Sequence, residues 1–157
     1  MTPLYLSDEE WMRRAISLSR RCPPSPGAYS VGAVLVDGGG TELSYGYSRE
    51  GDPTVHAEES ALAKLAPDDA RLRTATLYST LEPCSQRRSR PVPCARLVAR
   101  AGVRRVVIAW REPALFVTAC TGVAELRAAG IEVVELARLA GAARQVNAHL
   151  WAAGPGS

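Results

Sequence analysis

The second half of the chain alternates short β-branched runs with helical segments, and this alternation restricts the possible folds more than any other feature. Strand-like runs occur at 76–81, 103–110 and 131–136, of which 103–110 is rich in Val and Ile, and helical patterns at 94–101 and 123–129 separate them. Strands that alternate with helices in this way form parallel β-α-β units. The pattern therefore predicts a parallel sheet with helices packed on it.

The first half adds an antiparallel hairpin. Its two apolar runs, at 31–36 and 42–47, are separated by a turn of three consecutive glycines. Further helices are expected over 7–22, where a capping box starts the helix, and over 56–65 and 139–150. The expected fold class is α/β, with a mixed five-stranded sheet and helices on both faces. We expect one domain over residues 1–151 and a frayed tail over 152–157.

Length and composition limit the classes of protein. A chain of 157 residues suits one domain, and 46% hydrophobic with 22% charged residues is typical of a globular protein. A net charge of +3 argues against a protein that mainly neutralises nucleic acid. The sequence has no apolar run of 18 residues and no signal-like start, which predicts no membrane segment and a cytoplasmic location.

Three residues have the chemistry of a zinc site. His56-Ala57-Glu58 is followed by Pro83-Cys84 and later by Pro93-Cys94. One imidazole and two thiolates are good zinc ligands, and three protein ligands leave a fourth tetrahedral position for water, as in catalytic sites. All three lie where strands and helices meet, and helix N-termini favour thiolates. We predict one Zn²⁺ per chain with a bound water.

Glu58 is the predicted catalytic residue. It lies two positions after His56, in the first turn of a helix, so it can point towards the same metal without binding it. Zinc lowers the pKa of its water to about 7, and a carboxylate there can take up the proton and pass it on. Taken singly, the residues have simpler explanations, with His56 as a helix cap and the cysteines as buried apolar groups. Their combination and order favour the metal site.

Several motifs resemble those of the cytidine deaminase-like superfamily, in which this His-x-Glu and Pro-Cys pattern is typical and the Glu acts as general acid and base. The general motifs are Val31–Val36, Thr54–Glu58 and Thr80–Cys84. More specific segments are similar to the pyrimidine deaminases of riboflavin biosynthesis, above all to the fungal-type diamino-ribitylamino-pyrimidinone phosphate deaminase. These segments are Gly46–Glu50, Glu82–Arg87 with the long gap to Cys94, and Arg111–Pro113 with Phe116 and Val117.

The resemblance implies a cytidine deaminase-like three-layer α/β/α fold. It also implies zinc-dependent hydrolytic deamination of an amino-pyrimidine with release of ammonia. The substrate would be a small molecule, a ribosyl- or ribitylamino-pyrimidine phosphate of riboflavin biosynthesis. By family analogy we expect a homo-oligomer, a dimer or a tetramer.

The chain departs from its relatives at three points. Cytidine, deoxycytidylate and tRNA adenosine deaminases usually have two residues between the two cysteines, whereas nine separate Cys84 from Cys94, which argues against those groups. Many relatives have a pocket Asn where this chain has Ser48, so ring recognition is expected to differ. No reductase domain follows Trp151, so we do not expect the bifunctional bacterial enzyme.

The loop between the cysteines carries several arginines. A guanidinium forms paired hydrogen bonds with a phosphate, so this loop is predicted to contact one; the alternative is a solvated basic loop. The predicted substrate-binding residues are Ser48, Arg49, Ser85, Arg87, Arg88 and Arg90.

Of three other possible functions, one remains open and two are disfavoured. A related deaminase recruited to a natural-product pathway would keep the fold and metal and act on another aminated heterocycle, nucleoside or nucleotide. A zinc-stabilised binding module without activity would have no use for Glu58 beside an open ligand position. RNA editing is disfavoured by the charge and the cysteine spacing. Cys22 and Cys120 match no ligand spacing and are predicted to be buried free thiols.

Overall fold

The computed structural model describes residues 5–87, 89–113 and 120–152. In this part of the chain the central element is a five-stranded sheet in the order β2-β1-β3-β4-β5. The strands are β1 (Gly32–Val36), β2 (Glu42–Tyr47), β3 (Thr76–Leu81), β4 (Arg105–Trp110) and β5 (Glu132–Glu135).

The strand directions match the prediction of a mixed sheet. The hairpin strands β1 and β2 are antiparallel, and β1 is also antiparallel to β3. From β3 onward the strands are parallel: Leu77 pairs with Val106, and Val106 pairs with Val133. The carboxyl ends of β3 and β4 therefore lie at the same edge of the sheet, where open α/β sheets bind their ligands.

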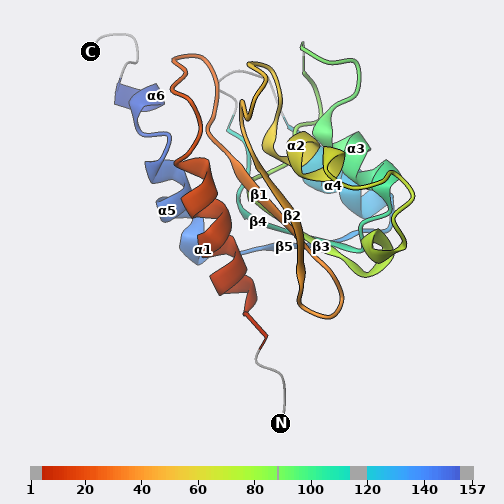
Figure 1. Ribbon diagram of the computed structural model, residues 1–157. Coiled ribbons are helices and arrows are strands. Elements are labelled where there is room, and N and C mark those ends of the chain that lie inside the picture. The colour runs from red at the N-terminus through yellow and green to blue at the C-terminus, as the bar shows by residue number, and fades with distance from the viewer. Residues whose placement is uncertain (1–4, 88, 114–119, 153–157) are drawn as a thin grey trace.

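Helices cover both faces of the sheet, so the three-layer α/β/α architecture is confirmed (Figure 1). On one face α1 (Asp8–Ser19) packs against β1 and β3, and α5 (Ala140–Gln145) packs against β4. On the other face lie α2 (Ala57–Ala63), α3 (Cys94–Ala101) and α4 (Gly122–Ala128). In this second layer α3 contacts both α2 and α4.

Local signals account for the ends of two helices. The side chain of Ser7 accepts a hydrogen bond from the backbone N–H of Glu10, which caps α1 as predicted. Helix α3 ends at Gly102, whose φ of 76° is the left-handed conformation that glycine adopts most readily. The predicted bounds of β2, β3 and α3 are confirmed residue for residue.

The predicted final helix is wrong as a single helix. Residues 139–150 form part of a 3₁₀ turn (Ala137–Leu139), helix α5 and the start of helix α6 (His149–Ala152). The helix is interrupted by a turn at 146–148, where the buried amide of Asn147 exchanges two hydrogen bonds with the backbone of Ser30. A second 3₁₀ turn, Ala70–Thr74, had no sequence prediction; Asp69 caps it.

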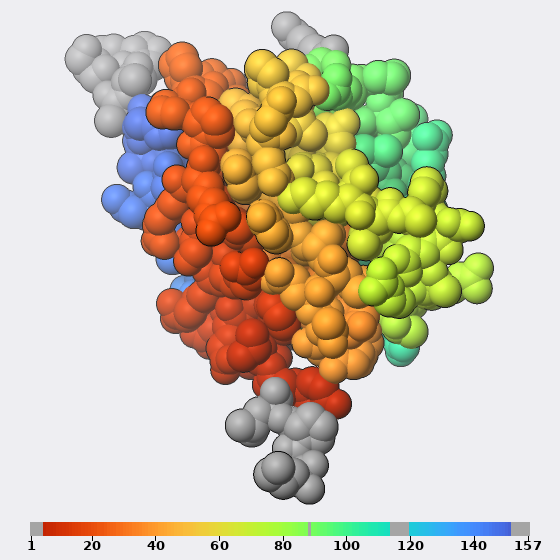
Figure 2. All heavy atoms as spheres, in the orientation of Figure 1, coloured from red at the N-terminus to blue at the C-terminus, as the bar shows by residue number. Residues whose placement is uncertain are grey.

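Most of the largest fully buried side chains come from α1 and the sheet, and Leu126 of α4 and Val98 of α3 add to them. They include Met12, Leu18, Leu35, Leu77 and Ile108. In the space-filling view the N-terminal half, from α1 through the hairpin to the 3₁₀ turn at 70–74, covers most of the visible face (Figure 2). Among the described residues, no helix is long and apolar enough to cross a membrane. Of the predicted tail, residues 153–157 lie outside the described residues.

Candidate active site

The three predicted metal ligands converge at the edge of the sheet where β3 ends. His56 directly precedes α2, Cys84 lies in the loop after β3, and Cys94 is the first residue of α3. The Nδ1 atom of His56 lies 3.6 Å from the Sγ of Cys84 and 3.4 Å from the Sγ of Cys94. The three ligand atoms lie within 4.8 Å of one another, so together they could hold one metal ion.

Close packing and backbone hydrogen bonds position these ligands. A Cβ atom at Gly46 would lie 2.4 Å from the carbonyl oxygen of Ala57, so only glycine lets β2 approach α2 this closely. The backbone N–H of Cys94 donates to the Cys84 sulfur at 3.2 Å, and the N–H of Ala95 donates to the Cys84 carbonyl at 3.0 Å. The start of α3 thus holds Cys84 in place.

The two thiols differ in acidity because one stabilises the other as a thiolate. The hydrogen bond from Cys94 is the main reason why the pKa of Cys84 lies far below its usual value. The same bond raises the pKa of Cys94, and burial adds to this. At His56, burial opposes the charged imidazolium, but the hydrogen bond to Cys84 and its charge outweigh burial and raise the pKa.

This donor set fits zinc. Two sulfurs and one imidazole nitrogen are ligands that Zn²⁺ prefers, and a tetrahedral ion bound by these three groups keeps one open position. The lowered pKa of Cys84 favours the thiolate that binds zinc. The prediction that His56, Cys84 and Cys94 could form a zinc site is confirmed.

Glu58 lies in the first turn of α2 and is only 4% exposed. The hydroxyl of Ser79, on β3, lies 2.7 Å from its Oε1 atom. The negative charge of Glu58 raises the pKa of both His56 and Cys94, which places the carboxylate next to the ligand set. The position suits a proton carrier beside a metal, but the catalytic role of Glu58 stays a prediction.

A cavity of about 650 Å³ opens at this site. This volume is in the usual range for a small-molecule site. His56, Glu58 and Cys84 line it together with Ser48 and Arg49. The cavity is therefore large enough for a substituted pyrimidine next to the metal ligands.

Ser48 and Ser85 both have backbone partners. The buried hydroxyl of Ser48 accepts a hydrogen bond from the N–H of Val31 at 3.0 Å, and that of Ser85 accepts one from the N–H of Thr121 at 3.0 Å. Ser48 also lines the cavity. Their predicted roles in substrate binding stay predictions.

Arg49 has no carboxylate partner among the described residues, which include every Asp and Glu of the chain. Its guanidinium donates to the carbonyl oxygens of Pro23 and Tyr29 and to the hydroxyl of Ser30. The backbone of Arg49 is left-handed, with φ 63°. Burial lowers the pKa of its side chain, consistent with a charge that lacks a counter-ion.

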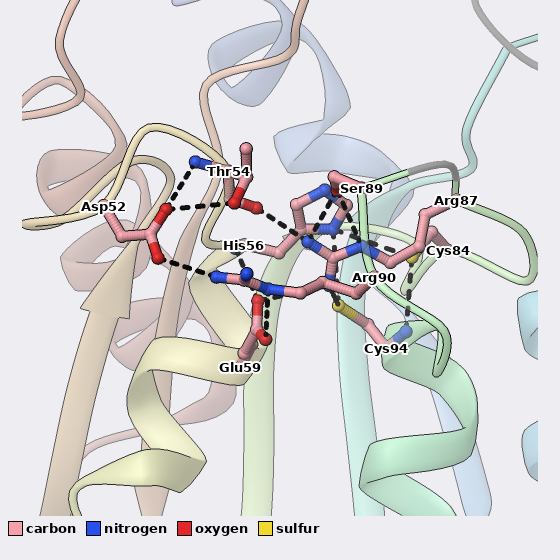
Figure 3. Close-up of polar contacts among 9 residues, drawn as sticks. All are labelled: Asp52, Thr54, His56, Glu59, Cys84, Arg87, Ser89, Arg90 and Cys94. Atoms are coloured by element: carbon pink, nitrogen blue, oxygen red, sulfur yellow. Dashed lines mark hydrogen bonds and ion pairs between the residues drawn. The ribbon is translucent and has the colours of Figure 1, made fainter.

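Two arginines of the loop between the cysteines, Arg87 and Arg90, are paired within the protein (Figure 3). Arg87 forms an ion pair with Glu59 at 3.1 Å, and Arg90 pairs with Glu59 and with Asp52 at 3.2 and 2.7 Å. Arg88 lies outside the described residues. Phosphate binding by this loop stays a prediction, but two of its three arginines already have carboxylate partners.

The sequence analysis missed Glu112 as a site residue. It follows β4 at the carboxyl edge of the sheet and lines the cavity. Burial, together with the charges of Cys84, Glu82 and Glu58, raises its pKa to about 7. Its place just after a parallel strand was a signal that could have identified it.

Glu82 supports this edge of the site. Its buried carboxylate accepts the backbone N–H groups of Glu112 at 3.0 Å and of Val123 at 2.9 Å. It therefore links the end of β3 to the loop after β4 and to the first turn of α4. Cys22 and Cys120 are free thiols, as predicted, but both are partly exposed, so the prediction that they are buried is wrong.

Comparisons with known proteins agree with this geometry. The model of the family described as the cytidine and deoxycytidylate deaminase zinc-binding region matches residues 6–110. The diaminohydroxyphosphoribosylamino-pyrimidine deaminase of Schizosaccharomyces pombe is 43% identical over 130 residues, which are 81% of this chain and 31% of that protein. The chain spans about a third of the length of the riboflavin-biosynthesis relatives that it matches.

Two solved structures share the fold over most of the chain. Acinetobacter baumannii RibD superposes with a TM-score of 0.77 at 35% identity, over 92% of this chain and 39% of that chain. A C-terminal deletion mutant of Aspergillus oryzae Rib2 deaminase, in complex with DARIPP, superposes with a TM-score of 0.68 at 25% identity. That match covers 92% of this chain and 98% of the other.

The expected resemblance and the cytidine deaminase-like fold are thus confirmed. The family match covers more than half of the sequence and includes Glu58 and all three residues of the ligand set. This chain belongs to the cytidine and deoxycytidylate deaminase zinc-binding family.

Proposed function

We propose that this protein is a zinc-dependent hydrolytic deaminase that converts an amino-pyrimidine into the keto-pyrimidine and ammonia. The observation that carries the proposal is the buried carboxylate of Glu58, which lines the same cavity as the metal ligands His56 and Cys84. A purely structural zinc site needs no carboxylate at an open ligand position. The names of the relatives support the same chemistry.

His56, Cys84 and Cys94 would hold the metal. When bound, zinc would act as a Lewis acid and lower the pKa of a water molecule to about 7. The protein's part is to hold that water at the ring carbon that carries the amino group and to move its protons.

Glu58 is the group that moves the protons. In the net reaction a water oxygen bonds to the ring carbon and the bond from that carbon to the amine breaks. Glu58 takes one proton from the water and delivers it to the adjacent ring nitrogen. It then takes the remaining proton from the new hydroxyl group on the ring carbon and passes it to the departing amine, which leaves as ammonia while the carbonyl of the product forms. The hydroxyl of Ser79 holds one oxygen of the carboxylate, so the other oxygen is available for these transfers.

Glu58→Gln tests the mechanism, because it keeps the shape of the side chain and removes its basic group. General acid–base groups contribute about 10²–10⁴-fold, so ammonia release should fall by at least this factor while zinc content and circular dichroism stay unchanged. Glu125→Gln, on the exposed side of α4, is the matched control and should behave like the wild type. Near-normal turnover of Glu58→Gln would remove this residue from the mechanism.

The proposed substrate is a ribosyl- or ribitylamino-pyrimidine phosphate of riboflavin biosynthesis. Support comes from the name of the Schizosaccharomyces pombe relative and from the Rib2 deaminase complex. The cavity beside the ligand set is large enough for a pyrimidine with such a substituent.

Within this proposal, Arg49 is the best-placed group for the phosphate. Of the five N–H groups of its guanidinium, three have acceptors among the described residues, which leaves two for a ligand. A charge without a carboxylate partner on the wall of a substrate cavity favours an anionic ligand. Arg87 and Arg90, in contrast, are already paired with carboxylates.

The test compares phosphorylated and dephosphorylated substrate. Loss of a charge-assisted hydrogen bond costs about 1.5–3 kcal/mol, or roughly 10- to 100-fold in kcat/KM. Arg49→Ala should lose this factor on the phosphorylated substrate only, and Arg90→Ala is the comparison for the loop between the cysteines. An equal loss on both substrates would show that Arg49 supports the cavity wall and does not bind the phosphate.

We also propose that residues 1–151 form one deaminase domain and that the enzyme works in the cytoplasm as a homo-oligomer. The family resemblance supports the oligomer, and four free cysteines are consistent with a reducing compartment. Light scattering on the purified protein should give a mass of two or more chains of 16.8 kDa each. The mass of a single chain would contradict the proposed oligomer.

A further inference from the structure

The guanidinium of Arg87 is buried in direct contact with the metal-ligand set (Figure 3). Its side chain is only 3% exposed, unusual for an arginine in a loop. Its Nη1 atom lies 3.1 Å from Oε1 of Glu59 and 3.9 Å from the sulfur of Cys94, and its Nη2 atom donates to the carbonyl oxygen of Thr54 at 2.7 Å. Both Nε and Nη2 also reach the hydroxyl of Ser89.

These contacts use all the donors of the side chain. A guanidinium has five N–H groups, and Arg87 forms five contacts with four neighbouring residues. No donor is left for a substrate phosphate. The side chain therefore belongs to the wall of the metal site.

Glu59 connects this arginine to the histidine ligand. Its Oε1 atom, which pairs with Arg87, also accepts the backbone N–H of His56 at 3.2 Å. Its Oε2 atom pairs with Arg90, which continues to Asp52. A continuous chain of polar contacts thus runs from the Cys94 sulfur through Arg87 and Glu59 to His56.

The ion pair joins the segments that carry the ligands. Arg87 comes from the loop between Cys84 and Cys94, whereas Thr54 and Glu59 lie on either side of His56. Zinc binding needs a fixed separation of the three ligand atoms, and a loop of nine residues does not fix it alone. The planar guanidinium holds five N–H donors in a fixed fork, whereas a lysine ammonium has only three and lacks this rigid geometry.

The contact with sulfur also affects the metal ligand itself. An N–H group of a cation that points at a thiolate reduces the negative charge on the sulfur and fixes its direction. Partners that hydrogen-bond to metal ligands typically change metal affinity 10- to 100-fold when they are removed. Among the described arginines, only Arg87 has such a contact with a cysteine ligand.

We propose that Arg87 is a positioning residue of the metal centre, which orients the Cys94 thiolate and ties the cysteine loop to His56 through Glu59. This inference rests on the zinc site of the proposed function. It gives the long loop between the cysteines a role in holding zinc that is distinct from binding substrate.

The first test is the zinc dissociation constant, measured by competition with a chromophoric chelator on the full-length protein. Arg87→Ala and Arg87→Lys should both weaken zinc binding by about 10- to 100-fold. Arg90→Ala removes the other partner of Glu59 without touching a ligand, and Arg96→Ala removes an exposed arginine of α3. Both controls should stay within about 3-fold of the wild type, since neither contacts a metal ligand.

The second test is spectroscopic. In the Co²⁺-substituted protein, the sulfur-to-cobalt charge-transfer band should shift in both Arg87 variants and stay unchanged in Arg90→Ala. A merely structural loss would not move this band in a folded protein, so circular dichroism of each variant is recorded beside it. If Arg87→Ala fails to fold, the zinc affinity and the cobalt spectrum of Arg87→Lys test the proposal instead.

The outcomes separate this inference from the proposed function. A folded Arg87→Lys variant with the zinc affinity and cobalt spectrum of the wild type overturns the inference and leaves the deaminase proposal intact. A wild-type protein that binds no zinc overturns both. A wild-type protein that binds zinc but releases no ammonia from any aminopyrimidine overturns the proposed function alone.

Discussion

The surroundings of Glu112 raise the pKa of its carboxyl group well above the usual value. It lies half-buried on the cavity wall, and burial raises its pKa to about 7, with further increases from the charges of Cys84, Glu82 and Glu58. An unfolded chain releases this proton near pH 4.3, whereas the folded protein keeps it until about pH 7. Over this interval the folded protein binds more protons than the unfolded chain. The free energy of unfolding therefore falls as the pH rises.

Glu112→Gln should remove that dependence in the zinc-free protein. Relative to the wild type, the variant should gain about 1–3 kcal/mol in unfolding free energy between pH 4.5 and pH 7, because an amide carries no charge to bury. Urea unfolding at pH 5 and pH 8 measures the gain. Glu125→Gln on the exposed side of α4 is the control, and a wild type whose pH dependence matches that of Glu112→Gln would contradict the assignment.

At the scale of elements, Asn147, in the turn between α5 and α6, is connected through Ser30 to Arg49 on the cavity wall. The Asn147 amide donates to the carbonyl of Ser30 and accepts its N–H, and the hydroxyl of Ser30 accepts a hydrogen bond from Arg49. The C-terminal helices thus hold the loop before β1 that positions Arg49.

Asn147→Ala should therefore destabilise the protein. It leaves two buried backbone groups of Ser30 without partners, and each such group costs about 1–3 kcal/mol. The midpoint of chemical unfolding should fall accordingly, whereas Gln145→Ala, an exposed position in the same segment, should leave it unchanged. Equal midpoints for the two variants would mean that other contacts hold the break.

At the scale of the whole molecule, the metal site joins three segments that are far apart in the sequence. It brings together the start of α2, the loop after β3 and the start of α3. A metal that binds only the folded state stabilises that state by mass action, by about 4 kcal/mol at a free concentration of 1,000 times Kd. Zinc is therefore expected to support both the fold and the chemistry.

Removal of zinc should lower the melting temperature by roughly 10 °C at such saturation. Elemental analysis should find close to one zinc per chain in the wild type, and Cys84→Ser and Cys94→Ser should lose most of it. Cys22→Ser is the matched control because this thiol lies outside the ligand set. Full zinc occupancy in both ligand variants would exclude the assigned site.

Local patterns in the sequence determined the elements and the ligand set. Strands and helices show their apolar pattern within a few consecutive residues. The bounds of β3, β4 and the helix Cys94–Ala101 were therefore largely predictable. The positions of His56, Cys84 and Cys94 at the ends of elements were predictable for the same reason. The parallel sheet then brings these element ends to the same edge.

Only the tertiary structure decided which polar groups pair with one another. Arg87 and Glu59 are 28 residues apart, and Asn147 and Ser30 are 117 residues apart. Such pairs depend on how loops pack over the sheet. The local sequence pattern of a strand or helix carries no information about these contacts. The loop arginines were predicted to face a phosphate because their charge was visible in the sequence, whereas the carboxylates that meet them come from another segment of the chain.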